Sequence, residues 1–564
     1  MPKRPWMVGL PSLLAAACSS SPATQPPLPP CTATSGGAAG AVSQVYAGVT
    51  IIDPTQTSGC AVFQANASGA EIDYLLVPQA VNGVPDDSSR FLLGGAALPS
   101  APAPAPAADF GSAPLGAQQR FDLTLRRAER ELAAHLGPLV QPRAAPPIFA
   151  QPFAFGDRRP FKVCGTIECN THPTVVGFVR KVGAHVVVFQ DSADEANGRT
   201  LSSFDFDTLA AVFDTLLYPA DTSAFGRESD IDGNGIVMVL MTGKVNSLVA
   251  SPCTGGSIAG YFYGGDLLIG FSGGNSAEVF YAAVPDPNGN LSCTHSANGV
   301  KRTVPGTFIH EFQHMISFNH HVLQRGSRTG EELWLNEGLS HYAEELGGRL
   351  FLPGDSTTFC YFIFGDLYNS AQFLASPESH LLVDTAGIGG LSNRGAWWLF
   401  VRFVVDQFST DTTRNANNVV TRALDITGST GASNVGTATG TPFATVVERW
   451  ALANYVSDLA GFTTPPELQY KKWRFRADYV TIHDACVARI PSNPPPFPSS
   501  YPLIPGGGTA SALNISGTMR GGSGTYVIAQ HPVAAGQFAL RFSDPAGRAL
   551  RSSLAPRLNV IRIQ

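Results

Sequence analysis

Alternating apolar and polar positions predict short β-strands near both ends of the chain. Residues 41–96 contain such runs, among them 72–77, separated by Gly, Pro and Asp, so we predict an N-terminal β-domain. Residues 466–564 return to short runs rich in Gly and Pro, such as 538–542, which predict a C-terminal β-rich domain. These two segments are expected to flank the largest unit as separate small domains.

A linker with one helix is expected over residues 97–147. Residues 97–108 are mostly Pro and Ala, a composition that favours an extended, semi-rigid chain. Apolar residues then recur at helical spacing over 120–136 among many Arg and Glu, which predicts a surface helix. A Pro-rich segment follows this helix and precedes the largest unit.

The largest unit is predicted over residues 148–465, with strands first and helices afterwards. Apolar runs predict a hairpin, a buried strand and one further strand, and after Pro305 the spacing becomes helical. The strands and the helix expected before Pro305 lie at 174–180, 184–190, 201–217 (the helix), 236–242 and 277–284. A sheet followed by a helical half is typical of the α+β class.

The first residues resemble an export signal. Residues 1–17 have a basic start, a short apolar core and small residues at the end, directly before Cys18. This order resembles a bacterial lipoprotein signal, so Cys18 is a candidate lipidation site and residues 18–40, rich in Ser and Pro, a tether. We therefore expect an exported lipoprotein on the bacterial outer membrane or cell surface. The alternative is an ordinary signal peptide and a secreted protein.

Composition narrows the classes of function. The chain has 564 residues, a net charge of −6 and only 14% charged residues, which excludes a nucleic-acid partner and a coiled coil. Beyond the N-terminus no apolar run approaches the length of a membrane helix, so membrane attachment is expected through the N-terminal lipid only. Of 9 cysteines, the eight other than Cys18 fit four disulfides, and neighbours suggest Cys164–Cys169 and Cys253–Cys293.

The most informative motif is His310-Glu311-Phe-Gln-His314. Residues four apart lie on one face of a helix, so the two histidines can present their rings to one metal ion. Glu311 stands next to that ion and can take a proton from a metal-bound water. Zn²⁺ suits this work because it lowers the pKa of bound water to about 7. The plainer interpretation is two solvent-facing histidines on an ordinary helix.

A third ligand must come from elsewhere, and two residues are candidates. His320 has the metzincin spacing, but Ser317 replaces the required Gly, and no Met follows to form the methionine turn of that class. His320 and His321 are therefore expected to lie on a helix surface. Between His314 and Glu337 lie 22 residues, enough for a loop and an antiparallel helix to return Glu337 to the metal.

The surrounding residues resemble a known family. His310-Glu-Phe-Gln-His-Met-Ile-Ser-Phe-Asn and Trp334-Leu-Asn-Glu-Gly-Leu-Ser-His-Tyr-Ala-Glu-Glu-Leu are similar to the hyicolysin family of bacterial secreted zinc peptidases, within the gluzincins. So are Asp230-Ile-Asp-Gly-Asn-Gly and Gly395-Ala-Trp-Trp-Leu-Phe-Val-Arg-Phe. The resemblance covers about residues 160–460. It implies a zincin-like peptidase domain in which His310, His314 and Glu337 hold zinc and Glu311 is the catalytic base.

Several residues are candidates for supporting roles. Thermolysin-type enzymes carry an Asp four residues after the ligand Glu, where this chain has His341, and Glu344 shares the same helical face. One of these two can orient a zinc histidine. Donors for the oxyanion of the reaction remain an open choice among Tyr342, Tyr361, Tyr368, His380 and Arg394. The strand expected at 277–284 is either the sheet edge that binds a substrate peptide or a buried core strand.

Asp230, Asp232 and Asn234, followed by Gly235, match the start of a calcium-binding loop. Position 12 of such a loop is Met241 here, so this is no EF-hand, and a simple turn is the alternative. Trp397 and Trp398 are expected to pack in the core.

The sequence therefore predicts an exported zinc endopeptidase that acts on proteins or peptides. A non-catalytic surface binding protein on a zincin scaffold, and a zinc amidase that acts on cell-wall peptide, are the alternatives. The sequence makes no prediction of the oligomeric state.

Overall fold

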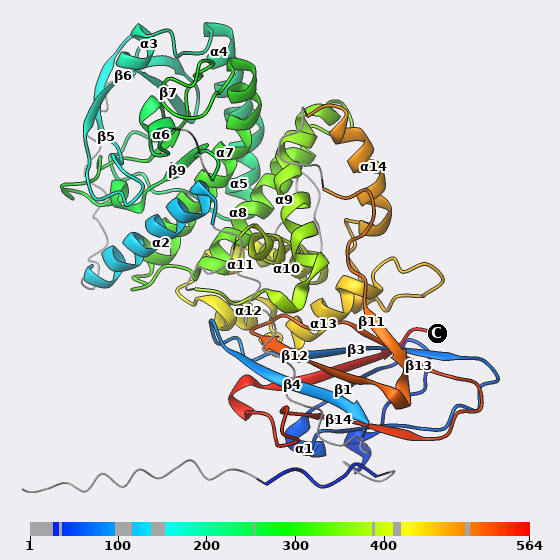
Figure 1. The fold of residues 1–564 in the computed structure, drawn as a ribbon. Coiled ribbons are helices and arrows are strands. Elements are labelled where there is room, and N and C mark those ends of the chain that lie inside the picture. The colour runs from blue at the N-terminus through cyan, green and yellow to red at the C-terminus, as the bar shows by residue number, and fades with distance from the viewer. Residues whose placement is uncertain are drawn as a thin grey trace, which may run out of the picture.

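The computed structural model describes residues 26–32, 37–95, 115–136, 153–385 without Pro252 and Thr254, 390–409, 419–490 and 497–564. These residues form two parts, which Figure 1 shows one above the other. One part holds a six-stranded sheet and most of the helices, and the other is a pair of β-sheets. The expected α+β class is thus confirmed. The signal segment 1–17 and Cys18 lie outside the described residues.

The β part combines strands from both ends of the chain, so the two separate β-domains expected from the sequence are one unit. Blue and red strands alternate within it in Figure 1. The first sheet has the order β1 (Val49–Ile52), β15 (Pro556–Arg562), β3 (Ile72–Ala80), β13 (Val527–His531) and β11 (Gly506–Thr509). The second has the order β12 (Asn514–Arg520), β4 (Ser88–Gly95), β14 (Phe538–Ser543) and β2 (Cys60–Phe63).

A shared apolar core holds these two sheets together. Phe63 of β2 packs edge-on against Tyr74 of β3, with ring centroids 5.1 Å apart, and both rings are fully buried. Phe91 and Phe542 lie in the same core. The alternation seen in the sequence places these residues on the inner faces, as expected for two sheets packed face to face.

The α+β part contains a six-stranded sheet. Its order is β5 (Arg158–Lys162), β6 (Thr174–Val182), β7 (Val186–Asp191), β8 (Val237–Met241), β10 (Val279–Ala282) and β9 (Gly260–Phe262). The predicted hairpin is present as β6 and β7, and β8 is buried throughout. The strand expected at 277–284 is β10, which lies between β8 and β9 and is buried. It is therefore not the sheet edge, which β9 forms instead.

The helical half follows the sheet, as the sequence predicts. Its main helices are α7 (Ala297–Phe318), α8 (Leu333–Arg349), α9 (Ser356–Ala375), α10 (Leu391–Phe408), α11 (Val419–Asp425), α12 (Gly431–Thr439) and α13 (Phe443–Val456). Shorter helices in and around the two parts are α1 (Pro54–Thr57), α3 (Ser192–Ala196), α4 (Ser203–Val212), α5 (Tyr218–Ala224) and α6 (Gly243–Ser247). Trp397 and Trp398 are buried in this half, which confirms their expected place in the core.

Two helices differ from expectation. The segment 466–564 begins with α14 (Phe475–Val487), which packs on α9 and is not a strand. Helix α2 (Ala117–His135) is present where a surface helix is predicted, but one of its faces is buried, Phe121 and Leu125 included. Figure 1 shows α2 beside β9 and α8 rather than apart from the main body.

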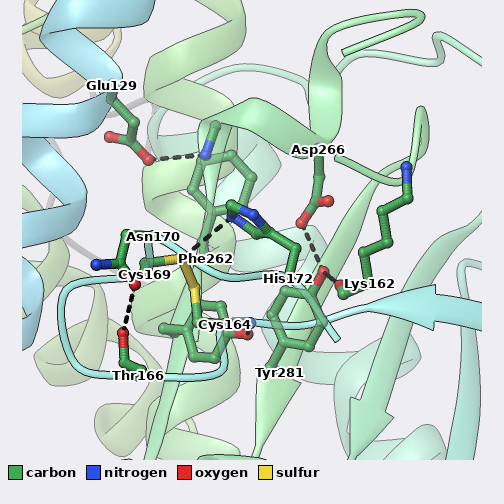
Figure 2. Close-up of a disulfide and its surroundings, with 12 residues drawn as sticks. Glu129, Lys162, Cys164, Thr166, Cys169, Asn170, His172, Phe262, Asp266 and Tyr281 are labelled. Carbon is green, nitrogen blue, oxygen red and sulfur yellow. Dashed lines mark hydrogen bonds between the residues drawn. A yellow bond between two sulfur atoms is a disulfide. The ribbon is translucent and has the colours of Figure 1, made fainter. Parts of the chain in front are cut away.

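Four disulfides link the described cysteines. Cys164–Cys169 and Cys253–Cys293 agree with the two pairs suggested by the sequence, and Cys31–Cys60 and Cys360–Cys486 complete the set. Figure 2 shows the first pair in its surroundings, close to β9 and β10. Over the residues described, no helix has both the length and the apolar character needed to cross a membrane.

Candidate metal centre

Helix α7 presents His310 and His314 to the interior of the protein. The side chain of Ser296 caps the helix by accepting a hydrogen bond from the backbone N–H of Gly299, at 3.0 Å. The two histidines are one turn apart, and their Nε2 atoms are 3.2 Å from each other. They are 8% and 2% exposed, so they are not the solvent-facing residues of the plainer interpretation.

Helix α8 brings Glu337 to the same point. Its carboxylate is fully buried and lies 3.7 Å from His310 Nε2 and 3.5 Å from His314 Nε2. One ligand atom from each of the three residues lies within 4.8 Å of the others. The Oε1 atom of Glu337 has no hydrogen-bond partner in the described part of the chain. Two imidazoles and a buried carboxylate with a free oxygen fit a divalent ion such as Zn²⁺.

His320, the alternative third ligand, lies elsewhere. Its Nε2 accepts a hydrogen bond from the backbone N–H of Arg227 at 3.1 Å. The prediction that His320 and His321 lie on a helix surface is wrong, because they are only 6% and 0% exposed. His321 faces the carboxylates of Glu331 and Asp425 at 3.8 and 3.9 Å, and burial lowers its pKa to about 4.

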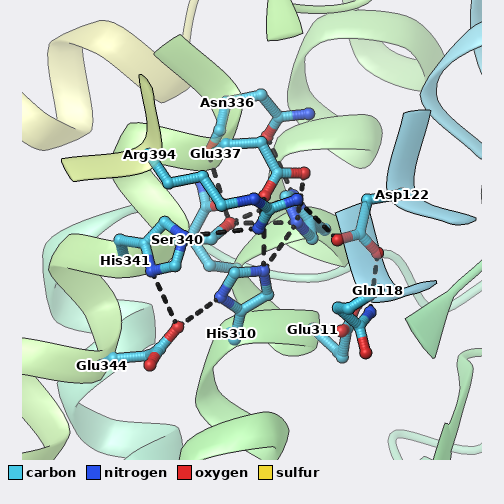
Figure 3. A network of polar contacts seen from close by, with 12 residues as sticks. Gln118, Asp122, His310, Glu311, Asn336, Glu337, Ser340, His341, Glu344 and Arg394 are labelled. Atoms are coloured by element: carbon cyan, nitrogen blue, oxygen red, sulfur yellow. Dashed lines mark hydrogen bonds and ion pairs between the residues drawn. The ribbon is translucent and has the colours of Figure 1, made fainter. Parts of the chain in front are cut away.

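Other side chains hold the two histidine rings in place, and Figure 3 shows Glu344 beside His310. His310 Nδ1 lies 2.7 Å from Glu344 Oε1, the contact that the shared helical face suggests. His314 Nδ1 lies 3.1 Å from Asn336 Oδ1 and 3.1 Å from the hydroxyl of Ser340. Asn336 and Ser340 were not among the residues predicted from the sequence, although they lie next to and one turn from Glu337 on the same helix.

His341 extends this network without facing the three candidate ligands. Its Nδ1 lies 3.1 Å from Glu344 and 3.0 Å from Asp366 of α9. Burial alone would lower the pKa of His341, but these two carboxylates raise it to about 10. Burial alone would raise the pKa of Glu344, but His341 and His310 lower it to about 2. Asp366, which was not predicted either, thus extends the network of ionisable groups behind His310.

Arg394 of α10 alone among the five oxyanion candidates contacts the candidate ligands. Its Nη1 donates to Glu337 Oε2 at 2.8 Å, and its Nη2 to Asp122 of α2 at 2.6 Å. Nothing in the sequence near Asp122 pointed to this site. The other four have other neighbours: Arg402 lies over the ring of Tyr342, Tyr361 accepts from Arg302, Tyr368 is partly buried against the apolar core, and His380 lies near Ser376.

Glu311 lies on α7 beside His310, with its carboxylate directed to the edge of the sheet. The backbone N–H of Phe262 in β9 donates to Glu311 Oε2 at 2.8 Å. Burial raises the pKa of Glu311 to about 7, and the side chain is only 5% exposed. The candidate base is thus held between the candidate ligands His310, His314 and Glu337 and the edge strand β9.

The predicted calcium loop has one more carboxylate than the sequence suggested. Ligand atoms of Asp230, Asp232 and Glu278 lie within 4.8 Å of one another. Glu278 Oε1 accepts hydrogen bonds within the loop, but the buried Oε2 has no partner among the described residues. Asn234 does not join this group: its amide donates to Asp232 at 2.7 Å, and its oxygen accepts from the backbone of Ile236.

Comparison with known proteins supports the class that this arrangement suggests, namely a metalloprotease. Over 195 residues the chain is 31% identical to the neutral metalloprotease ShpI of Staphylococcus hyicus. The matched segment is 35% of this chain and 40% of that protein, so the chain spans less than half of its relative's length. The partial resemblance to a metalloprotease is thereby confirmed. No family model matches the chain.

Proposed function

We propose that the chain is a zinc-dependent endopeptidase of the gluzincin type, with a zincin-like domain over residues 148–465. The observation that carries this proposal is the meeting of His310, His314 and Glu337 from two helices, with Glu311 beside them. The resemblance to a neutral metalloprotease supports peptide bonds as the substrate.

When bound, Zn²⁺ would supply a Lewis acid that polarises the substrate carbonyl and acidifies water. The protein's own residues do the remaining work. Glu344 and Asn336 orient the two histidine rings through their Nδ1 atoms. Glu311 carries the proton on its carboxylate, from the attacking water to the leaving amine. His310, Glu311, His314 and Glu337 are all buried, which limits the access of bulk water to the reacting groups.

Hydrolysis of a mixed set of internally quenched peptides tests the proposal, with and without a zinc chelator. Glu311→Gln is the decisive variant, and Glu168→Gln, an exposed residue far along the sequence from the site, is its matched control. We expect chelator-sensitive cleavage that Glu311→Gln reduces by about 10³-fold or more while one zinc per chain remains bound. Cleavage that survives in Glu311→Gln would contradict the role of the base.

Two other outcomes would favour the alternatives. Bound zinc without cleavage of any peptide would indicate a binding protein on the same scaffold. Cleavage of cell-wall peptide but not of protein-derived peptides would indicate an amidase. A chain that binds no zinc would refute the metal centre itself.

We also propose that the protein is exported, with its N-terminus attached to a membrane through Cys18. The four disulfides among the described residues support an oxidising compartment. Fatty-acid labelling of the wild type and of Cys18→Ser in a bacterial host tests the attachment. Label in both, or in neither, would contradict lipidation at Cys18.

Calcium is the second ion that we propose, at Asp230, Asp232 and Glu278. The support is that one carboxylate oxygen of each of these residues lies within 4.8 Å of the others, and that the buried Oε2 of Glu278 has no hydrogen-bond partner in the described chain. Ca²⁺ should raise the melting temperature of the wild type and of Glu168→Gln, but not that of Glu278→Gln. Equal effects on all three proteins would contradict the site.

A further inference from the structure

Helix α2 directs a stripe of polar side chains at the sheet edge beside the candidate metal centre. Gln118, Asp122, Arg126 and Glu129 follow one another at helical spacing, so they share one face. The last three are only 7%, 5% and 6% exposed. Charged residues are seldom so fully buried unless they are paired. Here Arg126 and Glu129 pair with each other at 3.1 Å, both bond the edge strand, and Asp122 pairs with Arg394.

These side chains bond the backbone of β9 and its flanking residues. Gln118 Oε1 accepts from the N–H of Ala259 at 3.0 Å, and its amide donates to the carbonyl of Gly260 at 3.2 Å. Arg126 donates to the carbonyl of Phe262 at 3.0 Å. Further along, Glu129 accepts from the N–H of Gly264 at 2.8 Å, the contact drawn for Glu129 in Figure 2.

The contacts of α2 thus resemble those of an added strand. A peptide that extends a sheet uses the same edge groups, alternately accepting from N–H groups and donating to carbonyls. Since β10 occupies the other side of β9, this edge is the one open to a partner. In the structure, side chains of α2 take the carbonyls of Gly260 and Phe262 and the N–H groups of Ala259 and Gly264, while Glu311 takes the N–H of Phe262.

A fourth side chain of the stripe reaches the metal group through one arginine. Asp122 lies 2.6 Å from Arg394 Nη2, and the two side chains are 9% and 7% exposed. Arg394 Nη1 in turn donates to Glu337 at 2.8 Å. Figure 3 shows Gln118 and Asp122 on the same side of the site as Glu311. The helix therefore contacts Glu337 through Arg394 as well as bonding the strand edge.

The composition of this interface suits a helix that can leave. Phe121 packs on Tyr261 with ring centroids 5.1 Å apart, and Leu125 is buried beside it, so α2 has an apolar anchor. Ala133 and the partly buried Leu132 also pack on apolar cores, and the rest of the buried face is polar and charged. A substrate backbone could replace the hydrogen bonds of Gln118 and Arg126 to the strand. Buried ionic contacts stabilise less than apolar packing of equal area, because desolvation offsets the attraction.

We propose that α2 is an internal competitor of the substrate, which occupies the peptide-binding edge of β9 and must leave it before a peptide can bind. This inference rests on the proposed peptidase function. The ligand that would take the place of α2 is an extended peptide, because the groups that α2 bonds are backbone N–H and C=O groups at the edge of a strand. The protein with α2 in place is then a latent form of the enzyme.

The test is the peptide hydrolysis of the full chain with altered α2 contacts. One variant combines Gln118→Ala with Arg126→Ala, a second is the isosteric Asp122→Asn, and Glu131→Gln on the exposed face of α2 is the control. An internal competitor multiplies KM by the reciprocal of the fraction of molecules in which α2 has left the edge of β9, and it leaves kcat unchanged. We expect the double variant to lower KM about tenfold, the second to lower it less, and the control to match the wild type.

Zinc content and melting temperature identify variants that fail to fold. If the double variant fails to fold, Asp122→Asn still tests the proposal, because it keeps the shape of the side chain. An unchanged KM in zinc-loaded, folded variants would overturn the proposal. Hydrogen exchange at the amides of Ala259 and Gly264 gives an activity-independent measure, because both are bonded to α2 side chains. Exchange in the wild type as slow as global unfolding would also overturn it, since α2 would then never leave.

If wild type and variants alike bind zinc and cleave nothing, the peptidase proposal fails instead. The exchange measurement still decides whether α2 leaves the edge. The two failures are thus distinguishable.

Discussion

Glu344 holds the ring of His310 from the side opposite the proposed metal. Its Oε1 lies 2.7 Å from Nδ1, so the ring points Nε2 at His314 and Glu337. We predict that Glu344→Gln and Glu344→Ala weaken zinc binding in that order. A ligand ring that is free to rotate must be ordered by the metal itself, and the histidine also loses electron density from the carboxylate.

The geometry sets the magnitude. Glutamine keeps an oxygen near Nδ1 but no charge, and a charge-assisted hydrogen bond is about twice as strong as a neutral one. The loss is then about 1.4 kcal/mol, or about tenfold in the dissociation constant of zinc. Alanine removes the whole contact, at about 2–3 kcal/mol, or about 100-fold.

Competition with a chromophoric chelator at neutral pH measures both constants. Asp366→Asn is the matched control, because Asp366 is linked to His310 only through His341 and Glu344. It should change zinc affinity by less than about threefold. A dissociation constant that is unchanged in Glu344→Ala would refute the positioning role. An equal loss in Asp366→Asn would show that a general loosening of the helices, rather than the contact with His310, is responsible.

Three further predictions concern stability. Burial raises the pKa of Asp266 to about 7, so the folded chain keeps a proton that the unfolded chain loses near pH 4. The free energy of unfolding should therefore fall as the pH rises from about 4 to about 7. Urea denaturation should show this loss, at most about 4 kcal/mol, in the wild type but not in Asp266→Asn, and parallel curves would contradict it. Arg394→Met leaves the buried carboxylate of Glu337 unpaired, so it should lower the melting temperature of the metal-free protein more than that of the zinc-loaded one; equal drops would argue against a metal at Glu337. Replacing Cys360 and Cys486 by Ser opens a link across a sequence separation of 126 residues and should destabilise the fold by up to about 5 kcal/mol, a prediction that an unchanged urea midpoint would refute.

The candidate ligands could be predicted from the sequence because their geometry is local. His310 and His314 are neighbours on any helix, and the 22 residues before Glu337 suffice for one return. Glu344 follows from the same helix as Glu337. Asp366 could not be predicted in this way, since the packing of α9 against α8 alone brings it to His341. Spacing along one element carries no information about a partner on another.

The β part shows the same limit on a larger scale. Alternation correctly indicated strands at both ends of the chain, because a period of two reports one inward face. It did not indicate that β3 pairs with β13 and β15 from the far end of the sequence. Two short stretches of strand can each be recognised alone, whereas their pairing depends on how the α+β part brings the chain ends together.

Helix α2 is the case in which local pattern pointed to the wrong environment. Over 120–136 its many charges suggested a solvent-exposed face, and the helix itself is present. Yet Asp122, Arg126 and Glu129 are buried, because the surface that receives them is itself polar: the open edge of β9 and the guanidinium of Arg394. Charge predicts exposure only when the protein offers no charged or hydrogen-bonding surface to receive it. In this chain the edge of β9 and the guanidinium of Arg394 offer such a surface, and the polar face of α2 occupies it.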